Sequence, residues 1–529
     1  FLIMKKKNIF LVCIIILIVS ITVRYWSIYH KGFSYDFATD NLILARNLSF
    51  TGESKIFNDK DVVLSSEIVS EKGVANKTSN ELTPILYKLL FNIFGFDKNI
   101  SLYCSLFLYG IISVLLFLLV FKLFNVRVAL IFSLLEIFSP LIVKESINVG
   151  VYEWAMLFLT IALLIYFWKE KPTLAKLFFV GLLMTLASLA RNSFLIIPIA
   201  FTLYEFIKHK SFKRAIVFIL PLIIVWSIYL GPGMLKGNSD NIYLSSSENT
   251  AGAYMHIFPD PYTWHFERDM YVESIQYSDA YNYDYSQFLG KYGYSVGLKN
   301  KILMYWASIT SYPKGFIAQT TFGGPIMVFL LILGGFYLYK NKKYLLKIFI
   351  IWGLLTYLFL IVAASNHWGH FITFQFPIFL MSALGIYWIS QFIVKQDIKK
   401  YLKYLFVGGF ILVLSAHLIQ STKWMFHEEY ENSGMEQTLS LIDIIKYAED
   451  QLNKKTDIIA VGVTGRAPQI LNWYTDYSFV YFAPDTVGKL LNENKLQWAF
   501  NQFGVTKVMG YDNELNDSII ETTDIDILK

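Results

Sequence analysis

The segment NISLYCSLFLYGIISVLLFLLVFKLFNVR, residues 99–127, decides the fold class of this chain. Its apolar part, 99–121, is long enough to cross a hydrocarbon core of about 30 Å, which needs roughly 20 helical residues. Two basic residues, Lys122 and Arg127, follow directly. An apolar span closed by a basic connector is typical of a transmembrane helix that ends in the cytoplasm.

The same pattern recurs along the whole chain, and it predicts about eleven transmembrane helices. The expected spans are 8–29, 99–121, 128–143, 151–168, 174–190, 193–207, 215–231, 321–339, 345–364, 371–393 and 402–421. The composition agrees, because 55% of the residues are hydrophobic, 16% are charged and the mean hydropathy is +0.46. We therefore expect an α-helical polytopic membrane protein, not a soluble domain.

Basic residues alternate between the connectors, and this alternation predicts the topology. They gather in every second connector, at Lys5–Lys7, Lys122/Arg127, Lys169/Lys171/Lys176, Lys208/Lys210/Lys213/Arg214, Lys340/Lys342/Lys343 and Lys395/Lys399/Lys400/Lys403. The positive-inside rule then places the N-terminus in the cytoplasm of a multi-pass plasma-membrane protein. The net charge of +6 arises in these connectors, so it does not indicate a nucleic-acid partner.

The outer loops 30–98 and 232–320 belong to a membrane domain predicted over 1–422. In the first loop, Phe37, Leu44 and Leu48 share one stripe, which suits an amphipathic helix on the membrane surface. A second apolar segment, 81–95, is too short to span and also predicts an interfacial helix. The loop 232–320 is rich in tyrosine, which suits either its own packing or stacking on sugar rings.

The tail 423–529 predicts a small extracytoplasmic α/β domain. Short apolar strands are expected at 457–463, 478–482 and 506–510, with helices at 439–452 and 485–494. The pair Gly462 and Gly465 is not a dinucleotide fingerprint, because the third glycine and the downstream acid are missing.

Asp36 and Asp40 are the candidate catalytic residues, just outside the membrane in the first outer loop. A carboxylate there could take the proton from an acceptor hydroxyl as a general base. Alternatively, Asp36 alone or both residues could hold Mg²⁺ or Mn²⁺ against a phosphate leaving group. The structural alternative is that Asp36 caps the helix and Asp40 is a solvated surface charge.

Further polar residues lie at the outer ends of the spans. Glu153 either lines a cavity or snorkels to the interface, and Arg191 suits either a substrate phosphate or a lipid headgroup. His367 and His370 form a weak metal signal and are better suited to packing or to a hydrogen bond to a phosphate. Glu136 lies deeper in its span and requires a partner from another helix.

The chain resembles the GT-C class of polytopic membrane glycosyltransferases, which includes protein O-mannosyltransferases and lipid A aminoarabinose transferases. The motifs that carry the resemblance are Ala45-Arg46-Asn47-Leu48 with Gly52 after Asp36, Thr83-Pro84 through Phe94-Gly95, Ser139-Pro140 with Glu153, Leu189-Ala190-Arg191, and Phe376-Pro377. Phe37 stands where the class often has a second acid, and His370-Phe371 replace a common Arg-Tyr pair. The Trp-Trp-Asp motif of oligosaccharyltransferases is absent from the sequence.

The resemblance implies transfer of a hexose or pentose from a polyprenyl-phosphate donor to a lipid, glycan or protein acceptor on the outer face. It implies Asp36 as base, Asp40 as its helper or a metal ligand, Glu153 at the acceptor cavity, and Arg191, His367 and His370 at the phosphate. Membrane lipids, but no nucleic acid, are the other expected partners. A transporter or flippase, or a polymerase of lipid-linked glycans, stays an alternative, and so does a non-catalytic scaffold.

Overall fold

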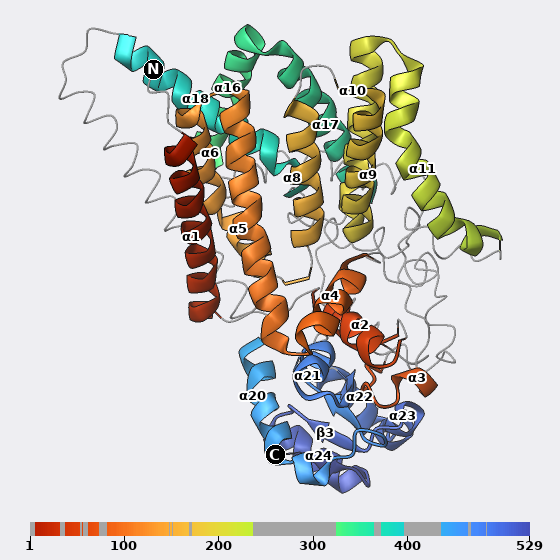
Figure 1. The fold of residues 1–529 in the computed structure, drawn as a ribbon. Helices are drawn as coiled ribbons and strands as arrows, with labels where there is room; N and C mark the ends of the chain where they lie inside the picture. The colour runs from red at the N-terminus through yellow and green to blue at the C-terminus, as the bar shows by residue number, and fades with distance from the viewer. Residues whose placement is uncertain are drawn as a thin grey trace, which may run out of the picture.

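Apolar helices form a bundle that is joined to a smaller α/β unit (Figure 1). The computed structural model describes residues 6–31, 38–52, 55–56, 62–72, 82–147, 149–150, 152–168, 172–235, 324–363, 372–395, 435–463, 467–482 and 484–528. The expected span 402–421, the tyrosine-rich loop beyond Leu235, and the residues Asp36, His367 and His370 lie outside these ranges.

The bundle contains the helices that the apolar segments predict. They are α1 (Lys6–Lys31), α5 (Lys98–Leu123), α6 (Val126–Ile137), α7 (Pro140–Ile147), α8 (Glu153–Trp168), α9 (Leu174–Ala190), the short η1 (Asn192–Leu195), α10 (Ile196–His209), α11 (Phe212–Leu235), α16 (Gly324–Asn341), α17 (Lys343–Ala363) and α18 (Gln375–Lys395). By length and composition, Asn8–Trp26, Asn99–Leu123 and Ile372–Ile393 can each cross a membrane. The total of eleven spans stays a prediction.

One expected span is wrong, because 128–143 is two helices and not one. Helix α6 ends at Ile137, and α7 begins at Pro140. Proline has no backbone N–H and its ring clashes with the preceding turn, so it interrupts a helix but fits the first position of the next one. The break lies at the Ser139-Pro140 motif.

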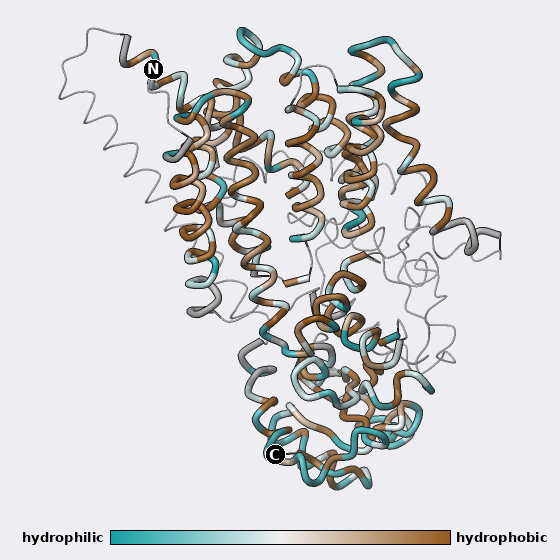
Figure 2. Tube along the Cα trace, viewed as in Figure 1, coloured by the Kyte–Doolittle hydropathy of each residue, from teal (hydrophilic) through white to brown (hydrophobic). Residues whose placement is uncertain are grey.

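Glycines allow the bundle helices to approach closely. A Cβ on Gly181 of α9 would lie 2.1 Å from the backbone oxygen of Phe218 in α11. A Cβ on Gly334 of α16 would lie 1.8 Å from the backbone oxygen of Met381 in α18. Small residues at such crossings let backbones pack directly, which stabilises helices in a lipid environment. Figure 2 shows the apolar character of these helices and the hydrophilic connections at the end of the bundle far from the α/β unit.

The α/β unit is built on a parallel sheet of four strands in the order β2-β1-β3-β4. Its elements are α20 (Met435–Tyr447), η8 (Glu449–Gln451), β1 (Ile458–Val461), α21 (Ala467–Thr475), β2 (Ser478–Tyr481), α22 (Pro484–Asn492), α23 (Leu496–Phe503), β3 (Lys507–Met509), α24 (Asn513–Thr522) and β4 (Asp526–Ile527). The strands β1, β2 and β3 coincide with the three that the sequence predicts. The domain boundary at residue 422 stays a prediction.

The first outer loop contains α2 (Ala38–Phe50), α3 (Val69–Lys72) and α4 (Leu82–Phe94), and the two longer helices differ in their surroundings. Helix α4 forms where an apolar helix was predicted, with Tyr87 and Phe91 buried and Leu89 and Ile93 exposed, and its place at the membrane interface stays a prediction. Helix α2 is not an amphipathic surface helix, because every residue over 41–47 is buried. It packs between α4 and α21, and the second partner is more than 400 residues away in sequence.

Candidate functional site

The candidate site lies at the end of the bundle that faces the α/β unit (Figure 1), where α8 begins and α9 ends. Two contacts join the outer-loop helices to this place. The Thr83 hydroxyl of α4 donates a hydrogen bond of 3.0 Å to the backbone oxygen of Ala190 at the end of α9. The Asn41 amide of α2 donates a hydrogen bond of 2.8 Å to the backbone oxygen of Gly150, just before α8.

Glu153, the first residue of α8, is fully buried at the centre of the site. Its Oε1 atom accepts hydrogen bonds from the Gly150 N–H at 2.7 Å and from the Tyr87 hydroxyl, and its Oε2 atom accepts one from the Tyr152 N–H at 3.2 Å. A carboxylate is favoured at a helix N-terminus by the helix dipole. Among the described residues no Lys or Arg forms an ion pair with Glu153, and its burial excludes the snorkelling alternative.

Tyr87 links α4 to Glu153 as a neutral donor. Burial first and the Glu153 carboxylate second raise the pKa of the Tyr87 hydroxyl well above its ordinary value near 10. The phenol therefore keeps its proton at physiological pH. Its ring also contacts Trp154 edge to face, with 6.2 Å between the ring centroids. Nearby, Phe91 and Phe96 pack edge to face at 5.2 Å between centroids.

Arg191 follows the last residue of α9 and packs on the residue that precedes Glu153. Its guanidinium carbon is 5.0 Å from the centroid of the Tyr152 ring, which is a cation–π distance. Tyr152 and Glu153 are consecutive, so the cation packs on the sequence neighbour of the buried carboxylate. Both residues lie at span ends, as the sequence predicted, and their roles stay a prediction.

Two residues that sequence reasoning missed follow Arg191. The Oδ1 atom of Asn192 and the Oγ atom of Ser193 are buried and have no hydrogen-bond partner in the described part of the chain. A buried polar atom without a partner costs about 1–3 kcal/mol, so such atoms mark places where a ligand or water completes the hydrogen bonding. The only sequence signal was that both residues are polar at a tight turn between spans.

Deeper in the bundle, Glu136 has the partner that its depth required. Arg24 of α1 lies 3.1 Å from its Oε1 atom, and both side chains are at most 1% exposed. Arg24 also lies 5.3 Å from the centroid of the Tyr109 ring. A third buried carboxylate, Glu205 of α10, contacts Arg214 at 2.8 Å.

The side chains of the other predicted site residues lie outside the described part of the chain. Asp40 belongs to the first turn of α2, and its side chain is outside the description, as are Asp36, His367 and His370. Within the described ranges no group of three His, Cys, Asp or Glu side chains could hold a metal ion. Both oxygens of Glu153 are already occupied by N–H and O–H donors, so that residue is not arranged as a metal ligand.

No protein-family model matches the chain, and neither does any curated protein. Solved structures do match. The oligosaccharyltransferase AglB from Archaeoglobus fulgidus, in complex with an inhibitory peptide and a dolichol-phosphate, has 12% identity, and the match covers 95% of this chain and 69% of that chain at a TM-score of 0.53. The same enzyme solved with Zn and sulfate has 13% identity, with 94% and 67% covered and a TM-score of 0.53.

ArnT from Cupriavidus metallidurans bound to undecaprenyl phosphate has 9% identity, with 97% of this chain and 89% of that chain covered at a TM-score of 0.48. AglB is a GT-C glycosyltransferase, and its match confirms the likeness of the chain to that class at the level of the fold.

Proposed function

We propose that this chain transfers a sugar from a polyprenyl-phosphate donor to an acceptor outside the membrane. The observation that carries the proposal is the cluster where α4, α8 and α9 meet. There Arg191 packs on Tyr152, Glu153 is buried without a cationic partner in the described part of the chain, and Asn192 and Ser193 offer unpartnered polar atoms. The fold supports the same chemistry, since AglB was solved with a dolichol-phosphate.

The phosphate of the donor would lie at Arg191. A guanidinium presents a planar set of donors that matches phosphate oxygens, and a charge-assisted hydrogen bond is about twice as strong as a neutral one. Asn192 and Ser193 extend this set at the same turn. His367 and His370 remain candidates for a further phosphate contact.

The proposed base is Asp36, with Asp40 as its helper. Asp36 takes the proton of the acceptor hydroxyl while the acceptor oxygen attacks the anomeric carbon, and the bond from that carbon to the phosphate oxygen breaks. The polyprenyl phosphate leaves with the electron pair, and Arg191 stabilises its charge. A Mg²⁺ or Mn²⁺ ion bound by Asp36 and Asp40 would supply further neutralisation of the phosphate. Glu153 shapes the neighbouring acceptor cavity.

The proposed orientation places this cluster on the outer face. The Lys/Arg-rich connectors follow α5, α8, α10 and α16, and the turn at Arg191 lies at the opposite end of the bundle. The positive-inside rule then supports a cytoplasmic N-terminus and an extracytoplasmic α/β unit. The sugar, a hexose or a pentose, and the acceptor, a lipid, a glycan or a protein, are to be identified by experiment.

The experiment uses purified protein in lipid nanodiscs with a panel of radiolabelled polyprenyl-phosphate hexoses and pentoses. Asp36→Asn should lower transfer by about 100-fold or more, the usual contribution of a general base. Asp443→Asn is the matched control, because Asp443 is 85% exposed on α20 and should leave transfer unchanged. Unchanged sugar transfer by Asp36→Asn would show that Asp36 is not the general base. Loss of transfer in the presence of a chelator, with recovery after addition of Mn²⁺, would show that the reaction requires a divalent metal ion.

The alternatives gain no comparable support. A transporter would use free charged groups inside the spans, whereas the deep charges of the described bundle pair as Arg24 with Glu136 and Glu205 with Arg214. A polymerase would depend on the loop 232–320, which lies almost wholly outside the described residues.

A further inference from the structure

The first outer loop extends the sheet of the α/β unit. Val63 and Phe479 exchange two backbone hydrogen bonds of 2.8 and 2.9 Å in antiparallel orientation, at the free side of β2. The Ser65 N–H donates to the Ser478 hydroxyl at 3.0 Å, and the Ser65 hydroxyl donates to the backbone oxygen of Lys454 at 2.7 Å. An added strand that covers a sheet edge binds through its main chain and removes an exposed edge.

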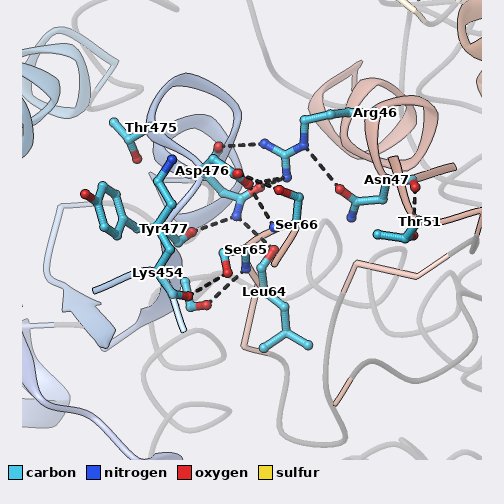
Figure 3. Close-up of polar contacts among 12 residues, drawn as sticks. Arg46, Asn47, Thr51, Leu64, Ser65, Ser66, Lys454, Thr475, Asp476 and Tyr477 are labelled. Atoms are coloured by element: carbon cyan, nitrogen blue, oxygen red, sulfur yellow. Dashed lines mark hydrogen bonds and ion pairs between the residues drawn. The ribbon is translucent and has the colours of Figure 1, made fainter. Parts of the chain in front are cut away.

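Arg46 of α2 joins the same two parts of the chain through its side chain (Figure 3). Its guanidinium donates to the backbone oxygen of Asn472 at 3.1 Å and to the Asn472 Oδ1 atom at 3.0 Å, and it lies 3.1 Å from Asp476. Its Nε atom donates to Asn47 at 3.2 Å. Arg46 is 1% exposed, so this charge is buried at the junction. Burial lowers the pKa of Arg46, and the Asp476 carboxylate opposes that shift.

Asp476 and Asn472 each contact both the helix and the added strand. Asp476 accepts hydrogen bonds from the Ser66 N–H at 2.9 Å and from the Ser66 hydroxyl at 2.5 Å. The Asn472 amide donates to the backbone oxygens of Leu64 at 3.0 Å and of Tyr477 at 2.7 Å. The backbone of Asp476 has φ +60°, a left-handed conformation that Asp tolerates and most residues avoid. The three segments are therefore fixed to one another by a single polar network.

Helix α2 transmits this attachment toward the candidate site. Asp40 precedes Arg46 by six residues, which is about 9 Å along a helix axis. Asn41, the next residue, is hydrogen-bonded to Gly150 beside Glu153. All residues from 41 to 47 are buried, so this stretch of the helix has no exposed face. The α/β unit is thus connected to the site through the buried part of α2.

We propose that Arg46 is a positioning residue, which fixes α2 to the α/β unit through Asp476 and Asn472 and thereby sets the place of the N-terminal end of this helix, where the sequence has the candidate carboxylates Asp36 and Asp40. The role of those carboxylates rests on the proposed function. In this proposal the α/β unit holds the first outer loop, which contains α2, in place. The attachment itself does not depend on any reaction and can be measured without a substrate.

The first experiment measures hydrogen exchange of backbone amides in Arg46→Lys. Lysine keeps the charge but cannot form the planar set of contacts to Asn472 and Asp476, so exchange in α2 and in residues 62–65 should accelerate by about tenfold, while α8 and α9 stay unchanged. The matched control is Arg214→Lys, the same substitution in a buried ion pair with Glu205 that is not attached to α2. Unchanged exchange in α2 of Arg46→Lys would overturn the attachment.

The second experiment restores the attachment by a covalent bond. In the register of the Val63–Phe479 bridge, Leu64 and Ser478 are the next pair. A non-hydrogen-bonded antiparallel pair of this kind has Cα atoms about 4.5 Å apart, within the range of about 4.4–6.8 Å for a disulfide. Arg46→Lys should lower kcat by roughly 10- to 100-fold with little change in the donor KM, since small misplacements of a catalytic group have effects of that size. In the background Leu64→Cys/Ser478→Cys, oxidised glutathione should restore kcat and dithiothreitol should abolish the gain.

The outcomes separate the two proposals. A kcat of Arg46→Lys equal to that of the wild type, or a loss that the disulfide does not repair, would overturn the positioning role. Wild-type protein treated with oxidised glutathione controls for Cys13 and Cys104, which are native free cysteines. Absence of transfer from every donor in wild-type protein would refute the proposed function, whereas the exchange data would still decide whether Arg46 holds α2.

Discussion

Two fully buried carboxylates, Glu153 of α8 and Glu205 of α10, lie near opposite ends of α8, and they have different partners. Glu153 begins the helix and accepts a hydrogen bond from Tyr87, and Glu205 accepts one of 2.5 Å from Tyr166 in the last turn. Glu205 also lies 2.8 Å from Arg214. Glu153 has only N–H and O–H donors of the described chain around it.

The difference separates a structural pair from a candidate binding site. At the Glu205 end the carboxylate and the Arg214 guanidinium neutralise each other within the protein, although the Nη2 atom of Arg214 is buried without a hydrogen-bond partner in the described part of the chain. At the Glu153 end, the carboxylate accepts only hydrogen bonds from N–H and O–H groups of the described residues. A buried carboxylate with no paired cation in the described part of the chain is a candidate for a functional site in a membrane protein.

The largest effect is expected from Glu205→Ala. This substitution leaves the guanidinium of Arg214 without its partner, and removal of one member of a buried pair costs about 3–5 kcal/mol; we expect the low end, because Arg214 is 19% exposed. The measurement is the free energy of unfolding in detergent. Sugar transfer per folded molecule should be unchanged. A variant as stable as the wild type would show that the pair does not hold this end together.

Arg191→Gln tests the opposite end and should act on substrate instead of stability. Loss of a charge-assisted hydrogen bond of about 2 kcal/mol corresponds to a roughly 30-fold lower kcat/KM, mainly through the KM of the lipid-phosphate donor. Arg127→Gln, an exposed residue at the far end of the bundle, is the matched control. Equal effects of the two variants would contradict a specific role of Arg191.

Tyr87→Phe removes one of the donors to Glu153 and keeps the ring. We expect a loss of about 1–2 kcal/mol in unfolding free energy, together with a reduced kcat, because Glu153 then loses one of its three hydrogen-bond donors. Tyr166→Phe is the comparison at the other end of α8. There Glu205 keeps its ion pair with Arg214, so kcat should not change. An equal loss of kcat in both variants would contradict the claim that the Glu153 end alone acts in the reaction.

The smallest effect is expected from Tyr511→Phe, because the Tyr511 hydroxyl donates its hydrogen bond to a backbone oxygen and not to a carboxylate. Its hydroxyl donates to Phe482 at 2.9 Å, worth about 1 kcal/mol. Burial raises the pKa of Tyr511 well above its ordinary value near 10. Its contribution is therefore complete below pH 10 and is lost as the pH rises through the folded-state pKa. Alkaline unfolding curves should be shallower for Tyr511→Phe than for the wild type, and identical curves would contradict this origin.

Local sequence patterns predicted the helices of the bundle and the strands of the α/β unit. Apolar runs determine where a helix or a buried strand can form, and Pro140 shows that one residue inside such a run can still divide it. Glu136 was predicted to need a partner, but depth alone could not select Arg24, because α1 and α6 are distant in sequence.

The site was predicted less completely, for the same physical reason. Glu153 and Arg191 could be chosen from their charge and their place at span ends. Asn192 and Ser193 offered only their polarity at a tight turn, and Tyr87 carried no signal outside its tertiary contacts. The burial of α2 was predicted wrongly, because its stripe pattern suits a membrane surface when the covering helix α21 is unknown. Arg46 was noted only as part of a motif, since Asp476 cannot be paired with it from spacing.

The strand addition at Val63 has a consequence for how the protein is made. A ribosome completes residues 62–66 long before it reaches β2, so the first outer loop must wait through the insertion of the intervening spans for the strand that it joins. A chain arrested before the α/β unit would enter the bilayer with that loop incomplete. If Arg46 sets the position of α2, the newborn polypeptide acquires activity only when the α/β unit has been synthesised and has folded onto that loop.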